Sequence, residues 1–294
     1  MNDKRRITRK GVAYLVPAAV LIIMFSIIPF VWNLVLSFQK WDGFSTPQFV
    51  GLNNYLNVIK NPLTRRALTN SILYAFTSTA GGVILGLVFA TLIFRLPKKE
   101  GGIFRLILYT PVMLPTAVVG IMFVFFFNPE MGLLNAFLRA IGLESITHVW
   151  LQDKSTAMAC IIFVAIWKCT GSVMMMTFAA IQGVPASLYE SSYLDGASFF
   201  RQMFSITFPL IKPMILLSAI NTLGAQFKSY DLIFTMTQGG PADLTTTVPI
   251  VMKKTAFMFG NFGSAAASGA IFTGVVAASI LLLRFILRGE SYEY

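Results

Sequence analysis

Long apolar stretches constrain the fold of this chain more than any other feature of its sequence. A helix that crosses a membrane needs about 20 mostly apolar residues. Six stretches have this length and character, near 12–38, 70–94, 104–127, 156–180, 213–236 and 263–287. Only 12% of the residues are charged, against about 25% in soluble domains. We therefore predict an all-α, polytopic membrane protein with six transmembrane helices.

The first apolar stretch follows a basic N-terminus, as in a signal peptide, but it is too long to be one. A cleavable apolar region has about 7–15 residues, whereas the run from Val12 to Phe38 is longer and ends without a small-residue cleavage site. We expect an uncleaved spanning helix. The predicted organisation is an N-terminal segment over 1–11, a transmembrane domain over 12–288 and a C-terminal tail over 289–294.

The net charge of +11 bears on membrane orientation. It does not indicate nucleic-acid binding, because the basic residues are scattered through apolar sequence. Lys and Arg are enriched in cytoplasmic loops. With the N-terminus inside, the predicted cytoplasmic loops hold more of these residues than the outer loops do. We therefore predict that both termini are cytoplasmic, as is the loop between the fourth and fifth spans.

The sequence offers little for catalysis or metal binding. His148 is the only histidine. Cys160 and Cys169 would lie about 13 Å apart on one helix, which is too far for a disulfide. A metal site of three or four ligands would need carboxylates that the apolar stretches lack, and the phosphate-binding pattern GxxxxGK[ST] is absent. We predict no metal, no catalytic residue and no ATPase site in this chain.

The longest predicted inner loop, over about 181–212, is amphipathic. Pro185 is typical of a helix start, and Asp195-Gly196 is a strong turn signal. We expect a second short helix after this turn, which ends before Pro209 and Pro213 lead into the fifth span. Two short helices joined by a turn would protrude from the membrane. The alternative is a connector that lies on the membrane surface.

The residues of this loop resemble the EAA signature of ABC importer permeases. The resemblance rests on Tyr189-Glu190-Ser191-Ser192, Leu194-Asp195-Gly196-Ala197-Ser198 and Phe208-Pro209-Leu210. Serines stand at 191 and 192 where the family usually has alanines, which is a change between small residues. Three further blocks resemble the branch that imports sugars: Phe49-Val50-Gly51-Leu52-Asn53-Asn54-Tyr55, Thr237-Gln238-Gly239-Gly240-Pro241 with Thr245 to Thr247, and Phe262-Gly263 with Ala265-Ala266-Ala267.

This resemblance implies a function and a set of partners. In that family the EAA loop docks onto a cytoplasmic ATPase, so the implied coupling residues are Tyr189, Glu190, Leu194, Asp195, Gly196, Ala197 and Ser198. The implied assembly contains a second, homologous permease, two copies of an ATPase that binds ATP and Mg, and an extracytoplasmic solute-binding protein, in a bacterial inner membrane. The implied solute is a carbohydrate. The alternatives are a non-sugar solute such as glycerol phosphate, or a secondary carrier.

Polar residues at membrane depth are the candidates for the solute path, because they are costly there and usually face a cavity or a partner. They are Trp167, Lys168, Ser172, Thr222, Gln226, Lys228, Ser229, Tyr230 and Asp231. On one continuous helix Thr222, Gln226 and Ser229 would share a face. Lys228 and Asp231 have the i+3 spacing of an ion pair, and the expected partner of Lys168 is either Asp231 or a residue of the second permease. The alternative is that these groups hold helices together by hydrogen bonds.

Overall fold

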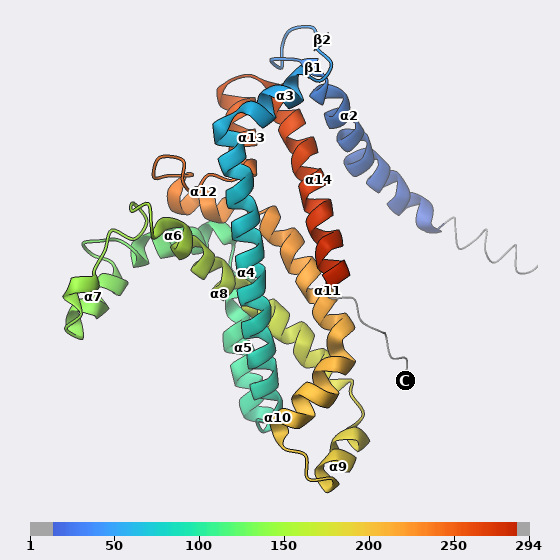
Figure 1. Ribbon diagram of the computed structural model, residues 1–294, viewed down its shortest axis with the longest axis vertical. Coiled ribbons are helices and arrows are strands. Elements are labelled where there is room, and N and C mark those ends of the chain that lie inside the picture. Colours follow the sequence, from blue (N-terminus) through green and yellow to red (C-terminus); the bar gives the residue numbers. More distant parts are fainter. Residues whose placement is uncertain (1–13, 287–294) are drawn as a thin grey trace, which may run out of the picture. The chain divides into compact units, whose positions relative to one another are not determined.

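The computed structural model describes residues 14–286, most of them in helices (Figure 1). Five helices are long and apolar enough to cross a membrane, or six if one bent pair counts as a span. The five run over Tyr14–Ser37, Pro62–Phe94, Ala157–Gln182, Phe199–Phe227 and Phe262–Ile286. These findings confirm the prediction of a helical protein with several apolar spans. The predicted segments 1–11 and 289–294 lie outside the described residues.

The described residues form two compact units, one of 14–64 with 251–273 and one of 65–250 with 274–286. The first unit contains these elements: η1 (Ile23–Ile27), α2 (Ile28–Ser37), β1 (Gln39–Lys40), β2 (Gln48–Phe49), α3 (Asn53–Lys60) and η4 (Lys254–Met258). Strands β1 and β2 pair antiparallel, so the chain is not purely helical. Three helices cross a boundary between the units: α4 (Pro62–Phe94), α13 (Val248–Lys253) and α14 (Phe262–Ile286).

Asn54 joins three segments of the first unit. Its buried side-chain amide donates to the carbonyls of Ser37 at 2.9 Å and Gln39 at 2.8 Å, and its oxygen accepts from the Ser264 hydroxyl at 3.3 Å. The start of α14 also approaches closely, because a Cβ at Gly263 would collide with the carbonyl of Gln39. Two of the sequence blocks noted above therefore meet in one structural joint.

The hairpin loop of the first unit is held by Asp42. Its carboxylate accepts from the backbone N–H groups of Phe44 and Ser45 and from the Ser45 hydroxyl. These hydrogen bonds favour the ionised form and lower the pKa of Asp42 to about 2. Phe44 lies at the tip of this loop, with its side chain 97% exposed.

The second unit is a bundle in which α8 is the central helix. Its elements, besides the ends of α4 and α14, are α5 (Lys98–Met113), α6 (Thr116–Phe126), α7 (Leu133–Ala140), η2 (Glu144–Ile146), α8 (Ala157–Gln182), α9 (Ala186–Leu194), α10 (Phe199–Gln202), η3 (Met203–Thr207), α11 (Phe208–Phe227) and α12 (Asp231–Thr237). Helix α8 packs against α5 and α11, and α12 packs against α6. Helix α8 can also approach α4 closely, because α4 presents Gly81, Gly82 and Gly86 to the side chains of α8. Figure 1 shows α9 and α10 at one end of this unit.

The third predicted span is not one straight helix. Helices α5 and α6 meet at an angle of 98°. Leu114 is extended, and Pro115 is the N-cap of α6. A residue before proline is disfavoured in the helical region, and proline has no N–H to continue the ladder. The single helix predicted over 104–127 is therefore wrong, and two prolines (Pro111, Pro115) mark the bend.

The fifth predicted span, over 213–236, is wrong at both ends. The helix starts earlier, because α10, η3 and α11 form one continuous helix over Phe199–Phe227. A π-helical turn precedes Pro209 there, and the Thr207 hydroxyl donates to the Gln202 carbonyl at 3.4 Å. The helix also ends earlier, at Phe227, and α12 begins only at Asp231. The short separate helix expected before Pro209 does not form.

Gly171 provides a test of the packing between α8 and α5. A Cβ there would collide with the carbonyl oxygen of Leu108 and come within 3.0 Å of the Tyr109 Cα. Both atoms are backbone, so neither moves easily. We expect Gly171→Ala to lower the free energy of unfolding by about 1–3 kcal/mol, measured by denaturation of the purified protein in detergent.

The matched control is Gly224→Ala on α11, where a Cβ meets open space. It should leave the stability unchanged or raise it by up to about 1 kcal/mol. Equal losses in the two variants would contradict this account of the packing.

Candidate functional site

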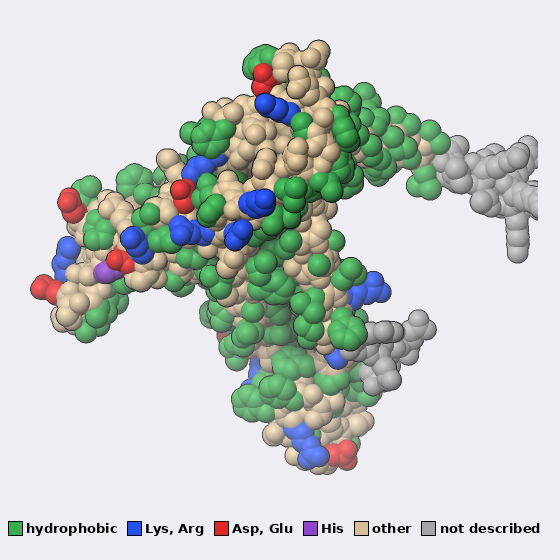
Figure 2. All heavy atoms as spheres, turned by 45° about the horizontal axis from the view of Figure 1, so that its top comes forward, with side chains coloured by type: hydrophobic (Ala, Val, Ile, Leu, Met, Phe, Trp, Pro, Cys, Tyr) green, Lys and Arg blue, Asp and Glu red, His purple; other side chains and the backbone are tan. Residues whose placement is uncertain are grey.

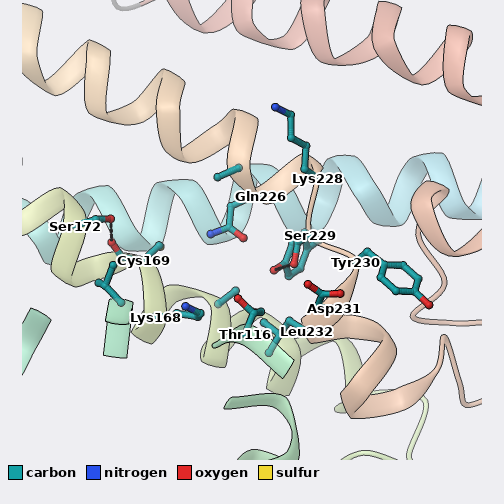
Figure 3. A pocket seen from close by; sticks show the side chains of 14 residues that line it. Thr116, Lys168, Cys169, Ser172, Gln226, Lys228, Ser229, Tyr230, Asp231 and Leu232 are labelled. Carbon is teal, nitrogen blue, oxygen red and sulfur yellow. Dashed lines mark hydrogen bonds between the residues drawn. The ribbon is translucent and has the colours of Figure 1, made fainter. Parts of the chain in front are cut away.

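A polar cavity of about 320 Å³ lies in the second unit. It is lined by Tyr74, Val112, Thr116, Ala165, Lys168, Cys169, Ser172, Ala225, Gln226, Lys228, Ser229, Tyr230, Asp231 and Leu232. The bend between α5 and α6 supplies Val112 and Thr116, and the break between α11 and α12 supplies the residues from Lys228 to Asp231. Both interrupted helices therefore open onto the same cavity. Figure 3 shows Thr116, Lys168, Gln226, Ser229 and Asp231 around one space.

Lys168 lies near the middle of α8 and is anchored to the backbone at the first interruption. Its ammonium group donates to the carbonyl of Leu114 at 3.0 Å. That carbonyl is free because the helix ends there. No ion pair joins Lys168 to Asp231 within residues 14–286, so the predicted pair is not formed. The Leu114 carbonyl is the hydrogen-bond partner that the structure gives the Lys168 ammonium group instead.

The second interruption changes the predicted helical faces. Lys228, Ser229 and Tyr230 lie between helices, so the i+3 and i+4 spacings of one continuous helix do not apply to them. The described coordinates contain no ion pair between Lys228 and Asp231, and Figure 3 shows Lys228 pointing away from Asp231. The prediction of that pair, and of a shared face for Thr222 and Ser229, is therefore wrong.

Tyr74 is a cavity residue that the sequence reasoning missed. It lies on α4, its side chain is only 1% exposed, and its hydroxyl donates to the Ser229 hydroxyl at 3.0 Å. Thr116 and Cys169 were missed as well. A tyrosine or threonine within an apolar stretch is an ordinary residue of a membrane helix, so only the spatial arrangement identifies it.

Two of the predicted path residues lie outside the polar cavity. Trp167 faces an apolar cavity of about 440 Å³ and packs against Phe123, with ring centroids 5.4 Å apart. Thr222 is buried within α11 and does not line the cavity. Trp167 and Lys168 are neighbours on a helix, so their side chains project in directions about 100° apart. The other predicted path residues all line the cavity.

The segment with the EAA-like sequence forms a compact tip at one end of the unit. Helix α9 ends in a turn in which the N–H of Ala197 donates to Ser192 at 2.9 Å and the N–H of Gly196 to Tyr193 at 3.0 Å. This is the pattern of a Schellman cap, which needs a left-handed residue, and Gly196 has φ +73°. The predicted turn at Asp195-Gly196 is confirmed. Glu190 lies in the second turn of α9, because the helix begins at Ala186.

Side-chain contacts fix this tip to the start of the next helix. The Tyr189 hydroxyl lies 2.9 Å from that of Thr207, and the Gln202 amide donates to the Ser192 hydroxyl at 2.9 Å. Ser198 caps α10 by accepting from the N–H of Arg201. Leu194, in contrast, is 86% exposed. Figure 2 shows both acidic and basic side chains at this tip, beyond a largely hydrophobic stretch of surface. These contacts hold the tip together, whereas most of the Leu194 side chain is left uncovered by the described residues.

Comparison with known proteins identifies the family. The profile described as "Binding-protein-dependent transport system inner membrane component" matches residues 82–289. The probable ABC transporter permease protein YurN of Bacillus subtilis is 36% identical over 280 residues, which are 94% of this chain and 96% of that protein. The diacetylchitobiose uptake system permease protein NgcF of Streptomyces coelicolor is 31% identical, over 95% of this chain and 82% of that protein.

The fold matches as well. A chain of a bacterial ABC transporter that imports the acidic polysaccharide alginate superposes with a TM-score of 0.84 at 22% identity, over 98% of this chain and 99% of that chain. These matches confirm the resemblance found in the sequence. The chain belongs to the family of binding-protein-dependent transport system inner membrane components, the permease subunits of ABC transporters.

Proposed function

We propose that this permease moves a carbohydrate through the polar cavity, driven by a separate ATPase that binds the α9–α10 tip. One observation carries the proposal: two interrupted helices meet at the same cavity, which is lined by polar side chains from both interruptions. Discontinuous helices build solute sites in many transporters, because the interruption exposes backbone groups and polar side chains at membrane depth.

The cavity has the chemistry that a carbohydrate requires. Lys168 donates hydrogen bonds and Asp231 accepts them, while the amide of Gln226 and the hydroxyl of Ser229 do both. A sugar presents hydroxyl groups that also donate and accept. Tyr230 also lines the cavity, although its ring is stacked on Phe234 with centroids 5.0 Å apart and points away from Thr116 and Lys168 in Figure 3. The names of relatives support the same solute class, since NgcF belongs to a diacetylchitobiose uptake system.

The proposed partners complete an importer. A second, homologous permease would pair with this chain, and two ATPase copies that bind ATP and Mg would meet the tips; this chain itself would bind no cofactor. A solute-binding protein would deliver the sugar on the opposite side of the membrane. Support for that partner comes from the structurally similar alginate transporter, which has been seen in complex with an alginate-bound periplasmic protein. In this arrangement the tip and both termini are cytoplasmic.

Two continuous helices connect the proposed ATPase surface to the cavity. Helix α8 carries Lys168, and three residues separate its end from the start of α9. The helix over Phe199–Phe227 starts at the tip and ends one residue beyond Gln226. A rotation of the tip would therefore be transmitted to both walls as a rigid-body movement, which is how alternating access usually proceeds.

The proposed function can be tested on the assembled complex. The permeases, the ATPase and the solute-binding protein are reconstituted together, and ATP hydrolysis is measured with maltose, trehalose, diacetylchitobiose and an alginate oligosaccharide. Stimulation by one of these saccharides, only when the binding protein is present, is the expected result. If glycerol 3-phosphate stimulates ATP hydrolysis and none of the four saccharides does, the carbohydrate assignment is overturned.

Asp231 is the most direct test of the cavity. Asp231→Asn keeps the shape of the side chain but removes its charge, and charged acceptors make the stronger hydrogen bonds. We expect the uptake rate to fall about tenfold, while the amount of assembled complex stays unchanged. Asn221→Ala is the control, because Asn221 is exposed on α11 outside the cavity lining. Unchanged uptake in Asp231→Asn would remove this residue from the solute path.

Leu194 tests the ATPase surface separately. Because its side chain is 86% exposed, Leu194→Asp should leave the unfolding temperature of the permease unchanged. It should nevertheless reduce co-purification of the ATPase at least about tenfold, since a buried unpaired carboxylate in the interface is costly. Phe44→Asp is the matched control, an exposed aromatic residue in the hairpin loop of the first unit. Normal ATPase binding by Leu194→Asp would show that the ATPase docks elsewhere.

A further inference from the structure

Two aromatic contacts link the end of helix α4 to the proposed coupling tip, one from its last residue, Phe94, and one from the residue that follows, Arg95. The guanidinium carbon of Arg95 lies 3.7 Å from the ring centroid of Phe199, the first residue of α10. The ring of Phe94 lies 6.1 Å from that of Tyr189 in α9, centroid to centroid. Helix α4 has no direct chain connection to α9 or α10, so these side chains are a link between segments far apart in sequence.

The Arg95 contact is well suited to a link that must hold during movement. A guanidinium group is attracted to an aromatic face within about 6 Å, and it stacks on the ring as a plane, which an ammonium group cannot do. No ion pair involves Arg95 in the part of the chain that the structure describes. The Phe199 ring is the partner that the structure gives the Arg95 guanidinium group, and this contact needs no carboxylate.

Helix α4 reaches from this link to the cavity. It is one unbroken helix from Pro62 to Phe94, and Tyr74 on it lies about 30 Å along the axis from Phe94. Tyr74 lines the cavity and holds the Ser229 hydroxyl at 3.0 Å. A displacement of the end of α4 would therefore move Tyr74 and change its hydrogen bond to Ser229, at the break between α11 and α12.

We propose that the stack of Arg95 on Phe199 is a coupling clamp, which carries movement of the α9–α10 tip into α4 and so to Tyr74. The proposal deepens the function proposed above and rests on it. Arg95 is a positioning residue here and touches neither solute nor ATPase. The competing account is that α8 and α11 transmit all of the movement through their direct chain connections to the tip.

The chain offers matched variants. Arg95→Gln removes the cation, Phe199→Leu removes the aromatic face but keeps an apolar side chain, and Phe199→Tyr keeps the face. Arg105→Gln is the control, because the Arg105 guanidinium lies 4.5 Å from the Phe178 ring. That contact is of the same kind but joins α5 to α8, without touching the tip.

The first measurement does not depend on the solute. Hydrogen exchange of residues 70–94 is compared in the full complex without nucleotide and trapped with ADP and vanadate. We expect trapping to change the exchange of this segment in the wild type, in Phe199→Tyr and in Arg105→Gln. The change should be lost in Arg95→Gln and in Phe199→Leu. A wild type without a change, or a change retained in all variants, would overturn the clamp.

The second measurement is the ratio of saccharide taken up to ATP hydrolysed, with the saccharide that stimulates the wild type most among the four tested above. We expect this ratio to fall about two- to fivefold in Arg95→Gln and Phe199→Leu, and no further in the double variant, because both remove the same contact. Basal ATP hydrolysis should be unchanged in Arg95→Gln, because Arg95 lies outside the α9–α10 tip. A normal ratio in both single variants would overturn the clamp, whereas the absence of stimulation in the wild type would count against the carbohydrate function alone.

Discussion

Every backbone polar group at membrane depth must find its partner inside the protein, because lipid offers none. An unbroken helix meets this requirement by itself, but the second unit interrupts two helices beside one cavity. At the bend before Pro115, the carbonyl of Leu114 loses its helical partner and accepts from the Lys168 ammonium instead. The remaining polar groups at the interruptions face the cavity. The cavity is therefore a direct consequence of where the helices stop.

This arrangement also accounts for the charges in the cavity. An ammonium group in an apolar bundle is costly without a partner, and a single carbonyl satisfies only one of its three donors. Lys168 and Asp231 face the same space without pairing, so both keep hydrogen-bonding capacity that a polar solute can use. Had they formed the predicted ion pair, the two groups would have satisfied each other and left less for a solute.

Sequence reasoning located the apolar helices because apolar length is a strong signal in one dimension. It also located the tip, since the turn at Asp195-Gly196 depends on local backbone geometry that glycine permits. It failed where the outcome depended on three-dimensional context. Pro209 and Pro213 resembled helix breakers, but Pro209 directly follows a π-helical turn and Pro213 lies inside α11 without ending it. Helix α5, in contrast, ends before Pro115. The break after Phe227 was missed because Lys228 and Ser229 are compatible with a helix, and Tyr74 was missed because nothing in its neighbourhood along the chain marks it.

The Schellman turn and the hydrogen bonds of Tyr189 and Ser192 make the tip self-supporting, while the Leu194 side chain is 86% exposed. Under the function proposed above, the side chains that stabilise the tip therefore differ from those that would contact the ATPase. Replacing an outward side chain removes none of these hydrogen bonds, whereas replacing an inward one does. A permease built in this way could accommodate a different ATPase through a few surface substitutions, with its cavity unchanged.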